Sequence, residues 1–451
     1  MSLMNAEGFF EDGGYDYVRF EQTDLHGMSR SQTITTRNFQ RFAESGVTVF
    51  GGLLGLDAQG DLVSGLEYLD ESAYGDHVMW PDPRTLSAVP WIPKTARVLA
   101  EPSWQDGTPV SVGPRFIMRQ MVQRLSDAGF VLRSTFEYDL YLVDRLSLSP
   151  AFEGKQLYWS LSNDFDGAFM VELLDTLSSA AVDVLSSNAA NGPGQLRITY
   201  AATVGVNAAD QAFTFKNAVK EIARKHGYTA SFMTMPYSNE NPSSGHFQYS
   251  LLERRGGANV FADEASPDGL SRLSKWWVGG QIKHTAALSA ICSPTVNCFR
   301  RYRTKFAPSR ATWGYEDTTS SVRVRAARTT ETQIESRLPA SGSNPYLVAA
   351  AVMAAGLDGI VCEEEPPEPS GSSQTSDLSA PLLPASLDAA LDALMADTVL
   401  HEYLGREFVQ LFVCVKRHEI EKARASEPAY GTDGWSTAVT EWERENLFNY
   451  L

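Results

Sequence analysis

The sequence predicts an α+β fold, with a small N-terminal domain over residues 1–105 and a larger domain over residues 106–451. One observation leads to this class and another to the two domains. The predicted strands do not alternate strictly with the predicted helices, so a regular α/β layer pattern is not expected. The chain has 451 residues, of which 43% are hydrophobic, and such a chain can bury more than one core.

The N-terminal domain is expected to be built on a hairpin over residues 16–35. An alternating run leads to a turn around His26 and Gly27, and a second run of the same kind follows. The strand-like stretch 97–104 completes this predicted domain.

The larger domain is expected to begin with a helix over residues 114–130, where apolar residues recur at helical spacing and Gly129 marks the end. A strand over residues 131–144 follows. The remaining predicted elements are helices over residues 169–187 and 211–227, an exposed acidic loop over residues 363–384, and helices near the C-terminus.

Composition argues against several classes of function. The formal net charge of −17 weighs against non-specific binding to nucleic acid or to anionic membranes, which both favour a positive surface. No run reaches the roughly 20 apolar residues that span a bilayer, and the first residues do not resemble a secretory signal. The four cysteines are too scattered for a disulfide framework, so we expect a cytoplasmic protein with reduced thiols.

Polar residues recur at positions i and i+2 on five predicted strands, and therefore share one face of each strand. Any one such pair is more often a solvated sheet face than a site, but five of them predict a sheet with one polar, concave face. The residues are Glu137 and Asp139; Gln195 and Arg197; His246, Gln248 and Ser250; Arg323 and Arg325; Glu335 and Arg337.

The side chains on this predicted face suit a metal-nucleotide and an acidic substrate. Carboxylates with one imidazole suit a hard divalent cation such as Mg²⁺ or Mn²⁺. Guanidinium groups bind phosphates and carboxylates through paired donors. The sequence contains neither a P-loop nor a Rossmann glycine motif, so any nucleotide site is of another kind.

Taken in order, these strands resemble the glutamine synthetase family. The resemblance covers essentially the whole chain and implies a β-grasp-like N-terminal domain before a catalytic domain with a curved antiparallel sheet. The C-terminal WERE pattern resembles the γ-glutamyl-amide ligase branch and its lengsin-like relatives. The matching stretches are FEYDLYLV, GPGQ, GHFQYSL, NCFRRYR, SSVRVR, IESRLPASGSNPYLVAAAVMAAGLDG and WEREN.

The resemblance implies a site between subunits that holds ATP, glutamate and two divalent metals, in a dodecamer of two stacked hexameric rings. The metal nearer the ATP phosphates is expected on Glu137, His246 and Glu335. We therefore expect ATP and one Mg²⁺ or Mn²⁺ per site, because the second metal position is altered.

The second metal position requires three carboxylates in the family, and here those places hold Asp139, Ala189 and Arg197. The pocket loses two carboxylates and gains one guanidinium, so its charge rises by three units while it loses a dication. We expect Arg197 to pair with Asp139 or to reach the substrate in a catalytic role. Drift in a site no longer used is the alternative.

The positions that bind ammonium in the family have also lost their carboxylates. They fall at Gly51, Ala189 and Phe306, none of which can accept a proton from ammonium. Free ammonia is therefore not expected as the substrate, and a bulkier, less polar amine suits the altered pocket better.

Other positions that contact ligands in the family are only partly matched in this sequence. By resemblance, Arg301 and Asn241 bind the carboxylate substrate, Arg337 acts on the transferring phosphoryl group, and Arg323 and Ser250 bind the nucleotide. The departures from the family pattern are Pro242, Gln248 and Thr318.

Three functions are compatible with this pattern. The first is an ATP-dependent ligase that joins a carboxylate to an amine. The second is a catalytically inactive homologue with a structural or regulatory role, and the third is a binding protein that senses a nucleotide or an amino acid.

Overall fold

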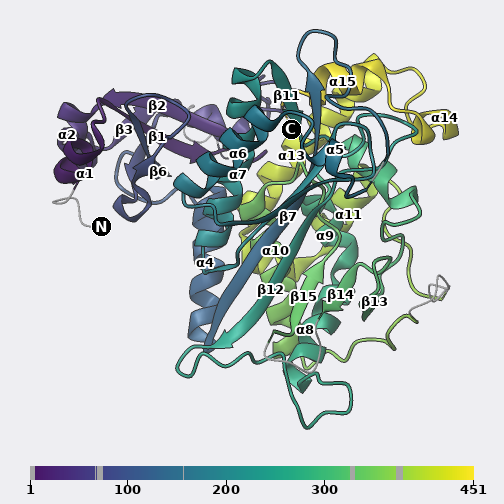
Figure 1. Ribbon diagram of the computed structural model, residues 1–451. Coiled ribbons are helices and arrows are strands. Elements are labelled where there is room, and N and C mark those ends of the chain that lie inside the picture. The colour runs from purple at the N-terminus through teal and green to yellow at the C-terminus, as the bar shows by residue number, and fades with distance from the viewer. Residues whose placement is uncertain are drawn as a thin grey trace.

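The computed structural model describes residues 6–66, 68, 75–155, 157–325, 331–371 and 379–450, and this part of the chain contains one six-stranded and one nine-stranded sheet. In Figure 1 the six-stranded sheet lies to the left, with the N-terminus, and the long strands of the other sheet run through the main body among the helices. The α+β class expected from the sequence is confirmed.

The six-stranded sheet has the order β2-β1-β6-β4-β3, with β5 paired to β6. Its first two strands form the expected antiparallel hairpin, whereas β1 and β6 are parallel. Helices α1 (Ala6–Gly13) and α2 (Phe39–Ser45) supply Phe10 and Phe39 to its core. The strands are β1 (Tyr17–Thr23), β2 (Ser29–Thr35), β3 (Val47–Val49), β4 (His77–Pro81), β5 (Ser87–Ala88) and β6 (Thr95–Ser103).

The hairpin turn lies where the sequence places it. The Asp24 carboxylate accepts hydrogen bonds from the backbone N–H groups of His26 and Met28, both at 2.9 Å. Gly27 has a φ of 82°, a conformation that glycine adopts without strain.

The nine-stranded sheet contains all five strands with paired polar residues, as the sequence predicts. Its order is β13-β14-β15-β12-β7-β9-β8, and β10 and β11 also pair with β7. Its strands are β7 (Phe130–Asp144), β8 (Val184–Ala189), β9 (Gln195–Tyr200), β10 (Thr203–Val204), β11 (Tyr228–Ser231), β12 (Gly245–Glu253), β13 (Trp313–Tyr315), β14 (Val322–Arg325) and β15 (Gln333–Ser336).

One predicted helix is wrong in its second half. The stretch 169–187 contains α6 (Gly167–Ser179), but the chain then turns at Ala181, whose φ is 62°, and continues as β8 (Val184–Ala189). The strand is stabilised by pairing with β9. This tertiary pairing overrides the helical spacing of the sequence.

A buried helix, α10 (Pro345–Val361), forms the centre of the helical layer. Asn344 caps it, and α8 (Arg272–Lys283) packs closely beside it, because a Cβ at Gly280 would lie 2.1 Å from the backbone oxygen of Ala355. The predicted helices near residues 114–130 and 211–227 are confirmed as α4 and α7. The other helices are α4 (Pro114–Asp127), α5 (Ser160–Asn163), α7 (Asn207–Lys225), α9 (Thr285–Cys292), α11 (Leu387–Ala396), α12 (Thr398–Leu404), α13 (Arg406–Ser426), α14 (Asp433–Thr437) and α15 (Glu441–Leu447).

Within the described ranges, no helix combines the length and the apolar character needed to cross a membrane.

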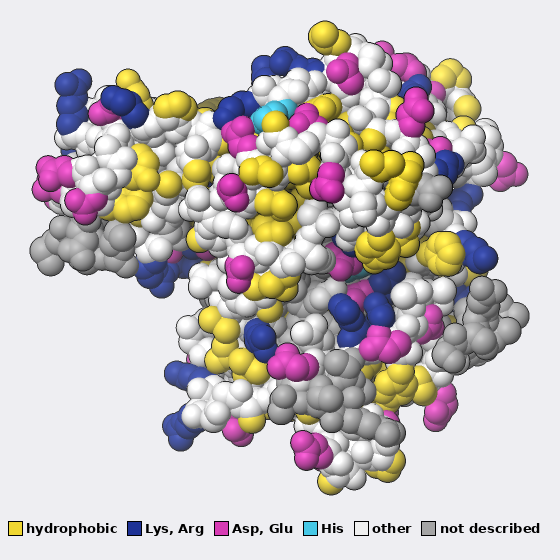
Figure 2. All heavy atoms as spheres, viewed as in Figure 1, with side chains coloured by type: hydrophobic (Ala, Val, Ile, Leu, Met, Phe, Trp, Pro, Cys, Tyr) yellow, Lys and Arg dark blue, Asp and Glu magenta, His cyan; other side chains and the backbone are white. Residues whose placement is uncertain are grey.

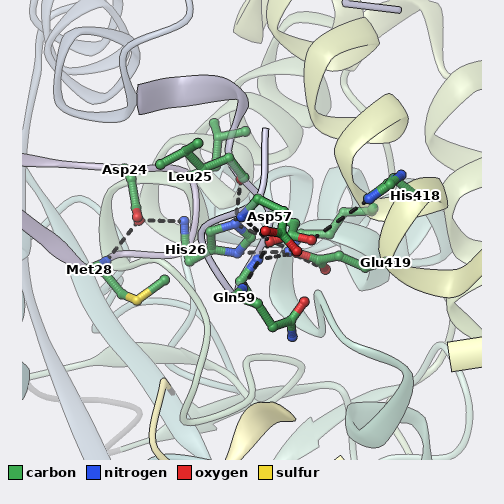
Figure 3. A network of polar contacts seen from close by, with 12 residues as sticks. Asp24, Leu25, His26, Met28, Asp57, Gln59, His418 and Glu419 are labelled. Carbon is green, nitrogen blue, oxygen red and sulfur yellow. Dashed lines mark hydrogen bonds and ion pairs between the residues drawn. The ribbon is translucent and has the colours of Figure 1, made fainter. Parts of the chain in front are cut away.

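A buried polar network joins the first hairpin turn to α13 (Figure 3). Lys416 on α13 is fully buried, and its ammonium group lies 3.0 Å from His26 Nδ1 and 2.9 Å from Glu419 Oε2. The other oxygen of Glu419 accepts a hydrogen bond from the backbone of Ala58 at 3.0 Å. We call this set the linking network; its members are Asp24, His26, Asp57, Lys416, Glu419 and Lys422.

Candidate functional site

Polar side chains from four neighbouring strands meet on one face of the large sheet. Register explains this: Glu137 on β7 lies opposite His246 on β12, and Asp139 lies opposite Arg197 on β9. Figure 2 shows basic and acidic side chains together in a hollow over the region of β14 and β15. We call this set the site cluster; its members are Glu137, Asp139, Arg197, His246, Glu335 and Arg337.

Asp139 and Arg197 form a bidentate ion pair. This pairing is one of the two positions predicted from the sequence for Arg197. Arg197 Nε donates to Asp139 Oδ1 at 2.7 Å and Nη2 donates to Oδ2 at 3.1 Å. The side chain and backbone N–H of Ser244 donate to the same Oδ2 at 2.7 and 3.2 Å. Burial alone would raise the pKa of Asp139, but Arg197 lowers it below its usual range, so the carboxylate stays ionised.

The three residues proposed for the nucleotide-side metal also lie together. His246 Nδ1 is 3.3 Å from Glu137 Oε1 and 3.7 Å from Glu335 Oε1. Burial, and then the charge of Arg337, lower the pKa of His246 well below its usual value, so the imidazole is neutral. A neutral imidazole and two carboxylates are ligands of the kind that bind a divalent cation such as Mg²⁺ or Mn²⁺.

The same carboxylates are engaged by arginines. Arg337 donates to Glu335 Oε1, and Arg323 and Arg325 lie 3.6 and 3.5 Å from Glu335 Oε2. Arg197 Nη1 lies 3.5 Å from Glu137 Oε1. Among the residues that the structure describes, no group of three His, Cys, Asp or Glu side chains is arranged to hold a metal as it stands. A metal on Glu137, His246 and Glu335 therefore requires these carboxylates to turn from the arginines.

Three buried nitrogen atoms of the site have no partner in the described part of the chain. They are two donors, Arg323 Nε and Arg337 Nε, and His246 Nε2, which is an acceptor in a neutral ring whose Nδ1–H faces the carboxylates. Arg301 is 2% exposed and donates to two backbone oxygens, those of Arg337 at 2.7 Å and Leu338 at 3.1 Å. Burial lowers the pKa of Arg301 to about 10, which is still high enough to keep it charged at neutral pH.

Two other proposed contact residues are Asn241, before β12, and Ser250, within it. The backbone oxygen of Asn241 accepts a hydrogen bond from Tyr141 at 2.6 Å, which fixes the loop before β12. Ser250 is buried on the same face of β12 as His246, and its hydroxyl donates to the backbone oxygen of Thr332 at 2.9 Å.

The three altered ammonium positions are differently placed. Ala189 is buried at the end of β8, whereas Phe306 is 62% exposed. Gly51 lies in the N-terminal part of the chain, where a Cβ would be 1.9 Å from the backbone oxygen of Gly75. An aspartate therefore does not fit at position 51 without a backbone shift.

Sequence reasoning missed Ser244 and Asn163. Ser244 holds Asp139, and the side-chain oxygen of Asn163 accepts a hydrogen bond from the backbone of Ala189 at 2.7 Å. Each lies outside the strand that it supports, so no alternating pattern marks it. Only the folded chain brings these residues to the site.

Comparison with known proteins agrees with this fold. A model described as glutamine synthetase, catalytic domain, matches residues 111–442. Lengsin from Mus musculus is 33% identical over 416 residues, which cover 90% of this chain and 72% of lengsin. Glutamate–isopropylamine ligase from Pseudomonas sp is 29% identical over 439 residues, which cover 94% of this chain and 95% of that protein. The solved structure of apo GmaS has a TM-score of 0.82 at 26% identity and covers 96% of this chain and 97% of its own.

Proposed function

Because this chain belongs to the glutamine synthetase family, we propose that it is an ATP-dependent ligase that joins a carboxylate to an amine other than free ammonia. The observation that carries this proposal is Arg301, a buried cation with no carboxylate partner among the described residues. Charge buried without a counter-ion is costly, so an anionic ligand is the expected partner.

The cations of the site exceed its carboxylates. Four carboxylates, those of Glu137, Asp139, Glu335 and Glu316, lie against five arginines, which are Arg197, Arg301, Arg323, Arg325 and Arg337. This excess of positive charge favours ligands that carry phosphate and carboxylate groups at once. ATP together with an acidic substrate has this chemistry.

In the proposed reaction, the γ-phosphoryl group of ATP passes to a carboxylate oxygen of the substrate, and ADP leaves. The amine nitrogen then attacks the acyl carbon, the bond from that carbon to the phosphate oxygen breaks, and the released phosphate takes up the proton that the nitrogen loses. Arg301 orients the acid, while Arg323 and Arg337, whose Nε–H groups have no partner in the described chain, receive the phosphoryl oxygens.

Glu137, His246 and Glu335 would hold one Mg²⁺ or Mn²⁺. When bound, this ion supplies positive charge to the phosphate oxygens. With Glu335 turned toward such an ion, the Arg337 guanidinium, which now donates to Glu335, would be free to bind the transferring group.

The amine is proposed to be less polar than ammonium. Gly51, Ala189 and Phe306 offer no carboxylate to bind a cationic amine or to accept its proton. Glutamate–isopropylamine ligase, one of the similar proteins, carries an alkylamine in its name.

The active assembly is proposed to be a cytoplasmic homo-oligomer, a dodecamer, with the site between subunits. The chain is proposed to divide into a β-grasp-like domain over residues 1–105 and a catalytic domain over residues 106–451. β6 ends at Ser103 and α4 begins at Pro114, which supports this division. Phe50, beside Gly51, is 45% exposed and thus available to a neighbouring subunit.

The test is release of ADP from ATP and Mg²⁺ with glutamate as the acid and a panel of ammonia, methylamine, isopropylamine and aniline. We expect at least one organic amine to give about tenfold faster ADP release than ammonia. Ammonia turnover in the ordinary range of about 1–10³ s⁻¹ would contradict the proposal.

The inactive homologue is a second candidate, favoured by the arginines that engage Asp139 and Glu335. It predicts that ATP binds and that no amine accelerates ADP release. The same assay, with nucleotide binding measured by calorimetry, separates the two.

A further inference from the structure

The carboxylate of Asp139 has little capacity left for another ligand. It accepts two hydrogen bonds from Arg197 and two from Ser244, at 2.7–3.2 Å. A metal ion at Asp139 would have to displace one of these donors. Because the side chain is 4% exposed, the displaced donor would find little solvent in exchange.

Sheet register holds Arg197 at this place. Arg197 on β9 pairs directly with Asp139 on β7, and it pairs on its other side with Asn188 on β8. The Asn188 side chain donates to the backbone oxygen of Ala189, and the methyl group of Ala189 offers no ligand atom. Because the Asn188 amide is engaged and Ala189 has no ligand atom, the guanidinium of Arg197 is the group on β8 and β9 that faces Glu137 and Asp139.

The guanidinium also extends toward the second carboxylate. Its Nη1 lies 3.5 Å from Glu137 Oε1, while Nε and Nη2 are bound to Asp139. One planar cation thus contacts both Glu137 and Asp139. A divalent ion placed between Glu137 and Asp139 would meet this positive charge at contact distance and be repelled by it.

We propose that Arg197 is the permanent cation beside Glu137 and Asp139, and that it takes the place of a second divalent ion there. The site then holds at most one such ion, on Glu137, His246 and Glu335. This inference deepens the proposed function, on which it rests, because it states the cation content of the same site.

A fixed guanidinium differs from a metal ion in what it offers a ligand. It cannot exchange, its charge does not depend on the metal concentration, and it binds oxygen atoms through N–H groups in a plane. The acidic pair is thus held by a cation that removal of metals cannot take away. Asp139 should keep its position in metal-free protein.

The test counts Mn²⁺ ions per chain in the full-length protein with ADP, by electron paramagnetic resonance and calorimetry. The native protein is compared with the double variant Ala189→Glu/Arg197→Glu, which supplies the two missing carboxylates. We expect the double variant to bind one more Mn²⁺ than the native protein does. Arg417→Glu, at an exposed arginine of α13 paired with Asp392, makes the same charge change as Arg197→Glu alone and should leave the count unchanged.

Two Mn²⁺ ions per chain in the native protein would overturn the inference, even if the ligase proposal stands. An unchanged count in a double variant that keeps native melting temperature and ADP affinity would overturn it as well. If the double variant does not fold, the native count decides. A native protein that binds ADP without any Mn²⁺, beside a variant that gains one ion, would support the role of Arg197 and contradict the metal in the proposed function.

Discussion

The linking network and the site cluster are both buried sets of charged side chains, but they differ in how completely they are paired. In the linking network, Lys416 contacts His26 and Glu419, and Lys422 donates to Asp57 at 2.6 Å. No buried side-chain atom of this network lacks a partner in the described chain.

The site cluster and its neighbouring arginines, in contrast, keep unpartnered donors on Arg323 and Arg337 and an unpartnered ring nitrogen on His246 within the described residues. Arg301 beside them is held by backbone oxygens alone. A fully paired network stabilises contacts between elements, whereas unpaired buried donors favour a ligand that is not part of the chain. The difference assigns a structural role to one region and a binding role to the other.

The largest effect on stability is expected from Lys416→Met. This change leaves Glu419 buried beside His26 without its cation, and the free energy of unfolding should fall by about 3–5 kcal/mol. Urea unfolding measures it. The double variant Lys416→Met/Glu419→Leu should recover part of the loss, and a loss below about 1 kcal/mol in the single variant would contradict the structural role.

Arg301→Met, in the site, should lower activity strongly and stability less. Burial already opposes the charge of Arg301, but its removal takes a donor from the backbone oxygen of Arg337, so the free energy of unfolding should fall by about 1–2 kcal/mol. Amine-dependent ADP release should fall by about 10²–10³-fold, because the acid loses its cation. Steady-state kinetics beside urea unfolding test both parts, and a large stability loss with normal kinetics would reverse the assignment.

A smaller effect is expected from pH. Burial and then Lys416 lower the pKa of His26, and burial lowers the pKa of His77 to about 4. Below pH 6.5 the unfolded chain binds protons that these folded histidines do not bind, so stability falls as pH falls. The loss should approach about 1.4 kcal/mol per pH unit for each histidine that remains neutral.

Urea unfolding between pH 6.5 and 5.5 measures this slope. His26→Gln should make the slope shallower, because the unfolded chain then has one fewer histidine that gains a proton which the folded chain does not bind. His418→Gln, which removes a partly exposed histidine of α13, serves as the matched histidine substitution. A slope that is the same in all three proteins would place the effect outside the linking network.

The strand alternation of the sequence was sufficient to predict the polar face and most of its residues. Period-two spacing places Glu137 with Asp139, and Glu335 with Arg337, on one face of any strand that contains them, regardless of how the strands pair. The order of the strands, and therefore the meeting of Glu137 with His246, came from resemblance to a family. Spacing within one segment contains no information about its neighbour in a sheet.

The sequence by itself determined the fold class, the hairpin at His26, the polar face and the absence of carboxylates at Ala189 and Arg197. Tertiary structure alone decided that 169–187 divides into a helix and a strand, and that Ser244 completes the shell of Asp139. The physical reason is the distance along the chain over which each interaction acts. Local patterns record which face a side chain takes, whereas hydrogen bonds between distant segments depend on register and packing that form only when the whole chain folds.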